Sequence, residues 1–88
     1  MNITYDTVKN KLNKKKHKID LSDAEGVLYD ENAITIEDCD HNEERFVTLG
    51  INHFGYLLVV TYHYRGENDI RIISARHAEP HERRTYEG

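Results

Sequence analysis

Four consecutive apolar residues at positions 57–60, Leu-Leu-Val-Val, limit the folds open to this chain more than any other feature. Successive side chains of a β-strand point to opposite faces, so a strand that is apolar at four consecutive positions needs cover on both faces. Such a strand belongs in the middle of a sheet. We therefore predict a sheet whose central strand spans residues 56–64.

The segments around this strand have the alternation and the polar turns expected of neighbouring strands. We predict strands at residues 33–37, 45–51 and 69–76, and a further short strand at residues 2–5. The later strands follow one another closely, so they are expected to pair antiparallel.

Helical signals occur at three places, which are residues 7–17, 21–30 and 82–87. Asp6 is a suitable N-cap for the first helix. Ser22 and Glu25 fit a capping box for the second helix. Pro80 stands where the first turn of the third helix tolerates proline.

The resulting order, (β)ααββββα, predicts an α+β domain. It consists of a small antiparallel sheet with two N-terminal helices and a short C-terminal helix, all packed on one face. Eighty-eight residues suit one compact domain over residues 1–88. The single cysteine, Cys39, cannot form an internal disulfide, and neither a signal-peptide core nor a membrane-spanning run is seen. We expect a cytoplasmic protein that is not bound to a membrane.

The formal net charge of -4 conceals a segregation of charge along the chain. Residues 9–18 hold six lysines and no acid, residues 19–44 hold ten acids and no Lys or Arg, and residues 45–88 hold six arginines and five acids. A phosphate backbone responds to a local cluster of positive charge. RNA binding is therefore permitted if the lysines and some arginines share a face. A solvated basic helix beside a solvated acidic loop is the alternative.

Two arginines of the strand at residues 69–76 stand among apolar neighbours. Strict alternation places Arg71 and Arg76 on opposite faces of the sheet. Burying an unbalanced charge is costly, so each arginine needs a partner. That partner is either a carboxylate such as Glu82 or the phosphate of a ligand, which the guanidinium fork fits. One cleft cannot hold both arginines on this reasoning, and Arg76, near the strand end, is preferred for the active site.

The run Lys14-Lys15-Lys16-His17 ends the first predicted helix. A histidine titrates near neutral pH, so His17 is a candidate acid or base. The alternative is an exposed basic helix end with His17 as a cap.

Six histidines raise the question of a metal site. The acidic turn at residues 38–44 contains Cys39 and His41, but its spacing matches no zinc or calcium loop. His77 and His81 are separated by Pro80 and do not share a helical face. We predict no metal site and no cofactor.

Several segments, taken in order, resemble the BrnT toxin family, a branch of the RelE/ParE-like toxins. The resemblance covers nearly the whole chain and lies in seven segments: Tyr5-Asp6 with Lys9, Asn13-Lys14-Lys15-Lys16-His17, residues 21–30, residues 45–50, residues 58–60, residues 70–76, and Glu82-Arg83-Arg84-Thr85-Tyr86. Ile-Arg-Ile-Ile-Ser-Ala-Arg at residues 70–76 is its most specific part. Lys18 follows His17 where the family often has Gly, so the turn between the first two helices is expected to differ.

The resemblance implies a RelE-like fold and a metal-independent endoribonuclease that stops translation. It also implies a BrnA-type antitoxin with a ribbon-helix-helix region, a heterotetramer in which two toxins flank an antitoxin dimer, and contact with operator DNA only through the antitoxin. Among the matching residues, Arg76 and Arg71 are the candidate phosphate stabilisers and His17 the candidate proton-transfer group. Lys9 and Lys16 would bind RNA or stabilise charge, and Tyr86 would orient the substrate or pack.

Two other functions stay open at this point. A non-catalytic interaction module would use the segregated charge to bind a partner protein. A ParE-like toxin would act on DNA gyrase instead of RNA.

Overall fold

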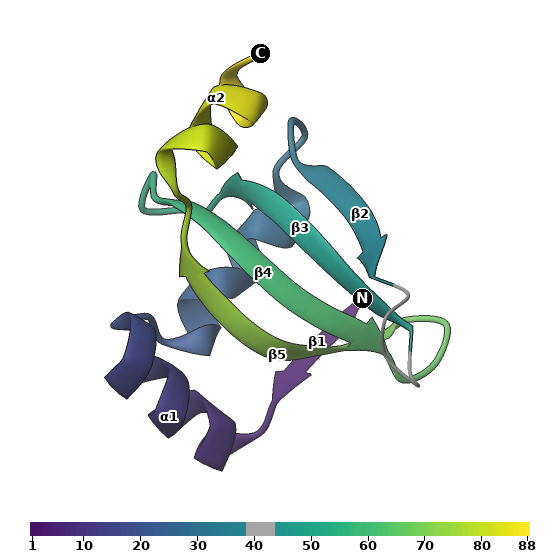
Figure 1. Ribbon diagram of the computed structural model, residues 1–88. Helices are drawn as coiled ribbons and strands as arrows, with labels where there is room; N and C mark the ends of the chain where they lie inside the picture. The colour runs from purple at the N-terminus through teal and green to yellow at the C-terminus, as the bar shows by residue number, and fades with distance from the viewer. Residues whose placement is uncertain (39–43) are drawn as a thin grey trace.

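The computed structural model describes residues 1–38 and 44–88, which form five strands and three helices. The helices are α1 (Thr7–His17), the 3₁₀ helix η1 (Leu21–Tyr29) and α2 (Pro80–Glu87). The strands are β1 (Asn2–Tyr5), β2 (Ile34–Asp38), β3 (Arg45–Ile51), β4 (Leu57–Tyr64) and β5 (Asp69–His77). The predicted α+β class is confirmed (Figure 1). No helix in the described ranges is long and apolar enough to cross a membrane.

All five strands form one sheet in the order β1-β5-β4-β3-β2. The prediction that the apolar run forms the central strand is confirmed, because β4 lies in the middle (Figure 1). The sheet is mixed, however, and the prediction of a purely antiparallel sheet is wrong. β1 pairs parallel with β5, whereas the other neighbours are antiparallel. The two parallel strands lie at opposite ends of the sequence, so no hairpin dictates their direction.

A β-bulge in β5 changes which side chains share a face. The register pairs Thr61 with Ser74 but Tyr62 with Ile72, so Ile73 is an extra residue. A bulge shifts the alternation beyond it by one residue. The prediction that Arg71 and Arg76 point to opposite faces is therefore wrong. Both lie on the face opposite the core, which we call the outer face.

The second helix differs from its prediction in type and in its cap. It is a 3₁₀ helix, which has three residues per turn. Its buried residues Leu21, Ala24 and Val27 recur every three positions and so form one line along it. The predicted capping box of Ser22 and Glu25 is wrong.

The N-cap of η1 is Asp20. Its Oδ1 accepts from Ser22 N at 3.0 Å and from Asn10 Nδ2 at 3.0 Å, which links the start of η1 to α1. Asp20 therefore satisfies donors of two elements, and Ser22 Oγ donates to the same oxygen at 2.9 Å.

The core lies between η1 and the inner face of the sheet. Leu21 and Val27 pack with Leu58, Val60 and Ile72, and all five are fully buried. Truncating one buried leucine to alanine typically costs about 2–5 kcal/mol. This packing fixes the sheet that carries the outer face.

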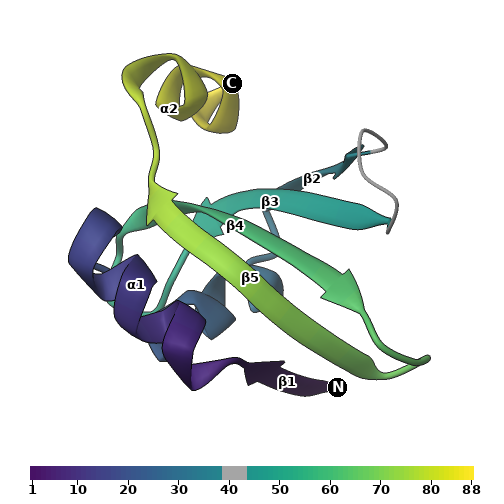
Figure 2. The same cartoon turned by 60° about the horizontal axis from the view of Figure 1, so that its bottom comes forward.

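α2 lies on the outer side of the sheet, away from α1 (Figure 2). Glu82 and Thr85 of α2 line a small cavity with the outer-face residues Val47, Leu49 and Val59, together with Ile34 and Ile36 of β2. The prediction that all helices pack on one face is thus wrong for α2. The strand at residues 45–51 is apolar on both faces, so the outer face also needs cover there.

α1 begins and ends with definite caps. Asp6 is the N-cap, as predicted, and its Oδ1 accepts from Val8 N at 2.7 Å and Lys9 N at 3.3 Å. Lys18 at the C-terminal end has φ 62° and ψ 29°, and its N–H bonds to Lys14 O. This left-handed conformation is the one that glycine favours at a helix end. Lys18 thus makes the same kind of turn without glycine.

Candidate functional site

Asn13 of α1 fixes that helix against the edge of β5. β1 pairs with β5 only as far as Ile72, and Asn13 supplies the missing edge partner beyond it. Its Nδ2 donates to Ala75 O at 3.0 Å and Ile19 O at 2.9 Å, and its Oδ1 accepts from Ala75 N at 3.1 Å. Asn13 is 6% exposed, so these bonds are shielded from water. They hold the basic side of α1 beside the bulge.

A first depression lies between α1 and β5. Its volume is about 200 Å³, and we call it the histidine groove. Its lining consists of Lys9, Leu12, Asn13, Lys16, His17, Ile73 and Ser74. Three residues predicted from the sequence, Lys9, Lys16 and His17, therefore meet here. They border the bulge that places Arg71 and Arg76 on the same face.

His17 is half-buried in this groove. Burial lowers the pKa of His17 below its usual value of 6.5, and the nearby charges of Lys16 and Arg76 lower this pKa further. The imidazole is therefore neutral at pH 7. A neutral imidazole can accept a proton, which is what a general base must do.

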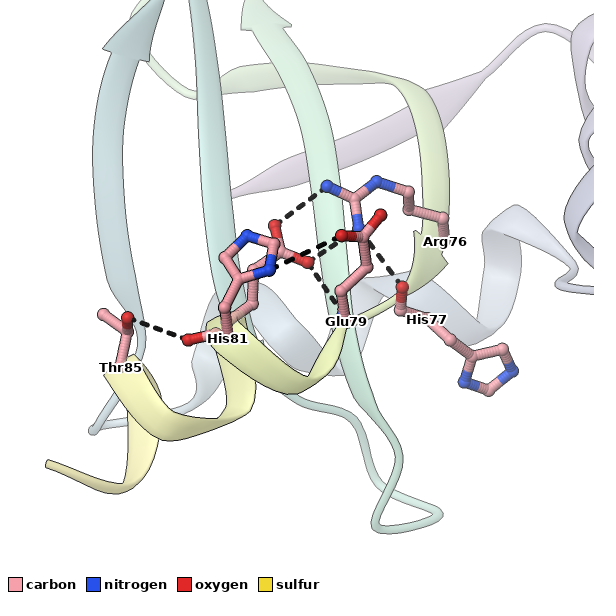
Figure 3. Close-up of polar contacts among 6 residues, drawn as sticks. Arg76, His77, Glu79, His81 and Thr85 are labelled. Carbon is pink, nitrogen blue, oxygen red and sulfur yellow. Dashed lines mark hydrogen bonds and ion pairs between the residues drawn. The ribbon is translucent and has the colours of Figure 1, made fainter.

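Arg76, the arginine preferred from the sequence, is engaged by α2. Its Nη1 donates to Glu82 Oε1 and its Nη2 to Glu82 Oε2, both at 2.8 Å, and Nη1 also donates to His77 O at 3.2 Å (Figure 3). This bidentate pair lowers the pKa of Glu82 to about 2. It raises the pKa of Arg76. The expected alternative of an ion pair with Glu82 is therefore present.

A second depression, of about 180 Å³, lies where α1 meets the other end of β4 and β5. We call it the arginine pocket. Its lining consists of Lys9, Arg45, His63, Arg65, Arg71, Ile72 and Ile73. Lys9 and Ile73 also line the histidine groove, so the two depressions adjoin. Arg71 thus belongs to the pocket and Lys9 to both.

Three residues of the arginine pocket, Arg45, His63 and Arg65, were missed from the sequence. The register places His63 opposite Arg71, and the pairing of Phe46 with Tyr62 places Arg45 beside His63. One basic residue on each of three adjacent strands thus forms a row. The signal was the short connection between the predicted strands at residues 45–51 and 56–64, because aligning these two strands as a hairpin would have brought Arg45 and His63 together.

Tyr86 lies outside both depressions. Its hydroxyl donates to Asp30 Oδ2 at 2.6 Å, and the same oxygen accepts from Ile51 N at 2.8 Å. Tyr86 thereby ties α2 to the turn after η1. The geometry favours packing over contact with a substrate.

The histidines considered for a metal do not converge. Residues 39–43 of the acidic turn, with Cys39 and His41, lie outside the described residues. His81 Nδ1 is 3.5 Å from Glu79 Oε2, and Thr85 Oγ1 donates to His81 O (Figure 3). The ring of His77 instead packs edge-on against Tyr56. Within the described ranges, no three His, Cys, Asp or Glu side chains gather as metal ligands would.

Comparisons with known protein families and solved structures show which proteins this chain is similar to. Residues 5–82 match the family model of BrnT, the ribonuclease toxin of a type II toxin-antitoxin system. Among solved structures, the ribonuclease toxin BrnT of Brucella abortus is similar, with a TM-score of 0.72 and 25% sequence identity. That similarity covers 90% of this chain and 97% of that one. A comparison with curated protein sequences finds no match.

Proposed function

This chain belongs to the BrnT family of ribonuclease toxins of type II toxin-antitoxin systems, and we propose that it is an endoribonuclease that cuts RNA on its outer face. One observation carries the assignment to this face. The bulge at Ile73 places Arg71 and Arg76 on the same face, and Arg71 adjoins the side chains of Lys9, Lys16 and His17 that α1 presents there. The cationic side chains and the neutral histidine therefore lie next to one another in two adjoining depressions.

The proposed reaction needs no metal ion, because protein cations supply the charge. The ribose 2′-oxygen attacks the adjacent phosphorus, the bond to the 5′-oxygen breaks, and the leaving 5′-oxygen takes a proton from water, so that a 2′,3′-cyclic phosphate and a 5′-hydroxyl form. His17 takes the proton of the 2′-hydroxyl, which typically contributes about 10²–10⁴-fold to the rate. Lys9, Lys16 and Arg71 stabilise the charge that develops on the phosphoryl oxygens.

We assign Arg76 a supporting part in this proposal. Glu82 occupies both ends of its guanidinium, so a phosphate would have to displace a carboxylate to bind there. The charge of Arg76 helps to keep His17 neutral, and the ion pair holds α2. Arg71 is therefore favoured over Arg76 as the direct phosphate ligand, and Tyr86 anchors α2.

The proposed setting is the cytoplasm of a cell that also makes an antitoxin. A type II toxin is neutralised by a protein, and we propose a BrnA-type partner with a ribbon-helix-helix region. Two toxins would flank an antitoxin dimer, and operator DNA would be contacted only by the antitoxin. Free toxin would stop translation by cutting RNA.

Expression of this chain alone in a bacterial host tests the proposal. Growth arrest with fragmented RNA is expected, and both effects should be lost in a His17→Ala variant but kept in a Lys15→Ala variant. Lys15 is exposed and lines neither depression. Arrest with intact RNA would instead indicate a gyrase-directed toxin, and no arrest would indicate an interaction module.

A further inference from the structure

We propose that the arginine pocket is a subsite that binds one phosphate of the RNA strand, next to the phosphate that is cut. This inference rests on the proposed function, and it assigns a role to Arg45, His63 and Arg65. The ligand is a phosphodiester group of the strand. The cut itself takes place where the pocket meets the adjoining histidine groove, between His17 and Arg71, so that Arg45, His63 and Arg65 hold the neighbouring phosphate.

The composition of the pocket indicates an anionic ligand. Its polar lining is entirely basic, with Lys9, Arg45, Arg65 and Arg71 beside His63. Among the described residues, no ion pair within 4.0 Å is found for Lys9, Arg45, Arg65 or Arg71, although Asp6 lies near enough to act on Arg71 electrostatically. Lys9, Arg45, Arg65 and Arg71 bring four positive charges to one pocket, and like charges repel each other. An anion in the pocket would relieve that repulsion.

Arg45 provides a second and independent observation. Its Nε is buried and has no hydrogen-bond partner among the residues that the structure describes. A buried donor without a partner typically costs about as much as a lost hydrogen bond. A phosphate oxygen in the pocket would supply the missing acceptor, and guanidinium groups suit such oxygens.

The position of the pocket selects RNA as the source of the phosphate. Lys9 and Ile73 line both the pocket and the histidine groove, so a strand that crosses Lys9 reaches both depressions. With one phosphate in the pocket, the next ribose and phosphate would lie at His17. The pocket would thus set the register of cleavage and contribute to binding more than to chemistry.

Binding of an uncleavable strand tests this inference separately from catalysis. The probe is a fluorescein-labelled 2′-O-methyl RNA oligonucleotide, whose attacking hydroxyl is blocked. Charge-assisted bonds of this kind predict an affinity loss of roughly ten- to a hundredfold for Arg65→Ala. The slope of log Kd against log salt should fall by about one, as expected for one lost phosphate contact. Arg84→Ala is the matched control, since Arg84 is exposed and lines neither depression.

A second variant guards against misfolding. Arg65, directly after β4, is exposed, so its replacement should not disturb folding. Arg45 is half-buried, and its replacement could. The affinity of Arg45→Gln is therefore compared with that of wild type only after thermal unfolding shows that the variant folds. In cleavage assays, both variants should raise KM and leave kcat nearly unchanged. Unchanged affinity for the probe would overturn the inference, as would a loss confined to kcat.

Failure of the ribonuclease proposal would give a different result from failure of the subsite proposal. If wild-type protein binds the probe through Arg65 but cuts no RNA, the ribonuclease proposal fails and the subsite stands. If Arg65→Ala and Arg45→Gln keep full affinity for the probe but lose an acidic protein partner, the subsite fails and the pocket belongs to that partner.

Discussion

Replacing Asn13 with alanine should strongly destabilise the domain. Asn13 makes three hydrogen bonds that join α1 to Ile19 and to the edge of β5, at 2.9, 3.0 and 3.1 Å. The variant leaves two carbonyl oxygens and one N–H without these partners in a site that is nearly closed to water. At about 1 kcal/mol for each net hydrogen bond, the expected loss is about 3 kcal/mol.

Thermal and urea unfolding followed by circular dichroism measure this loss. In a domain of this size, 1 kcal/mol shifts Tm by about 4–8 °C, so Tm should fall by roughly 12–24 °C. Asn32→Ala is the matched control, since Asn32 is exposed and should change stability by less than about 0.5 kcal/mol. A loss below about 1 kcal/mol for Asn13→Ala would refute the view that this side chain completes the sheet edge.

Three further predictions concern the single residues Lys18, Glu82 and His17. Lys18→Gly should stabilise the protein by about 0.5–1 kcal/mol in urea unfolding, because lysine is strained at φ 62°; a loss of stability would contradict this reading. Glu82→Gln should cost about 1–2 kcal/mol at pH 7, an amount reduced for the 38% exposure of the Arg76 side chain. The depressed pKa of Glu82 makes this contribution complete above the ordinary carboxyl pKa of 4.5 and lost as pH falls toward about 2, so the unfolding curves of variant and wild type should converge in acid. The lowered pKa of His17 predicts that kcat/KM for RNA cleavage is flat near pH 7 and falls in acid below pH 6.5; a rate that rises in acid would show that His17 is not the base.

Features set by local sequence were predictable, and features set by register were not. The central position of β4 follows from four apolar residues that need two covered faces, whatever surrounds them. The bulge at Ile73 has no such signature, because counting alternate residues assumes an unbroken ladder. That one extra residue moved Arg76 to the face of Arg71.

The residues of the candidate site also fall into those that local sequence brings together and those that strand pairing brings together. Lys16 and His17 are neighbours on one helix, so the sequence brings them together. Arg45, Arg65 and Arg71 lie on or beside three strands and meet only through the pairing of those strands. The bidentate contact of Arg76 with Glu82 was open as an alternative, since sequence alone does not distinguish an intramolecular carboxylate from a phosphate.

Analysis of the ends that purified protein leaves on a defined RNA tests the central claim most directly. The account predicts 2′,3′-cyclic phosphate and 5′-hydroxyl ends in the presence of a metal chelator. It also predicts no cut where a single 2′-deoxynucleotide replaces the attacking ribose, and strongly reduced cutting by the His17→Ala and Arg71→Ala variants. Intact RNA, or 5′-phosphate ends that form without the 2′-hydroxyl, would contradict it.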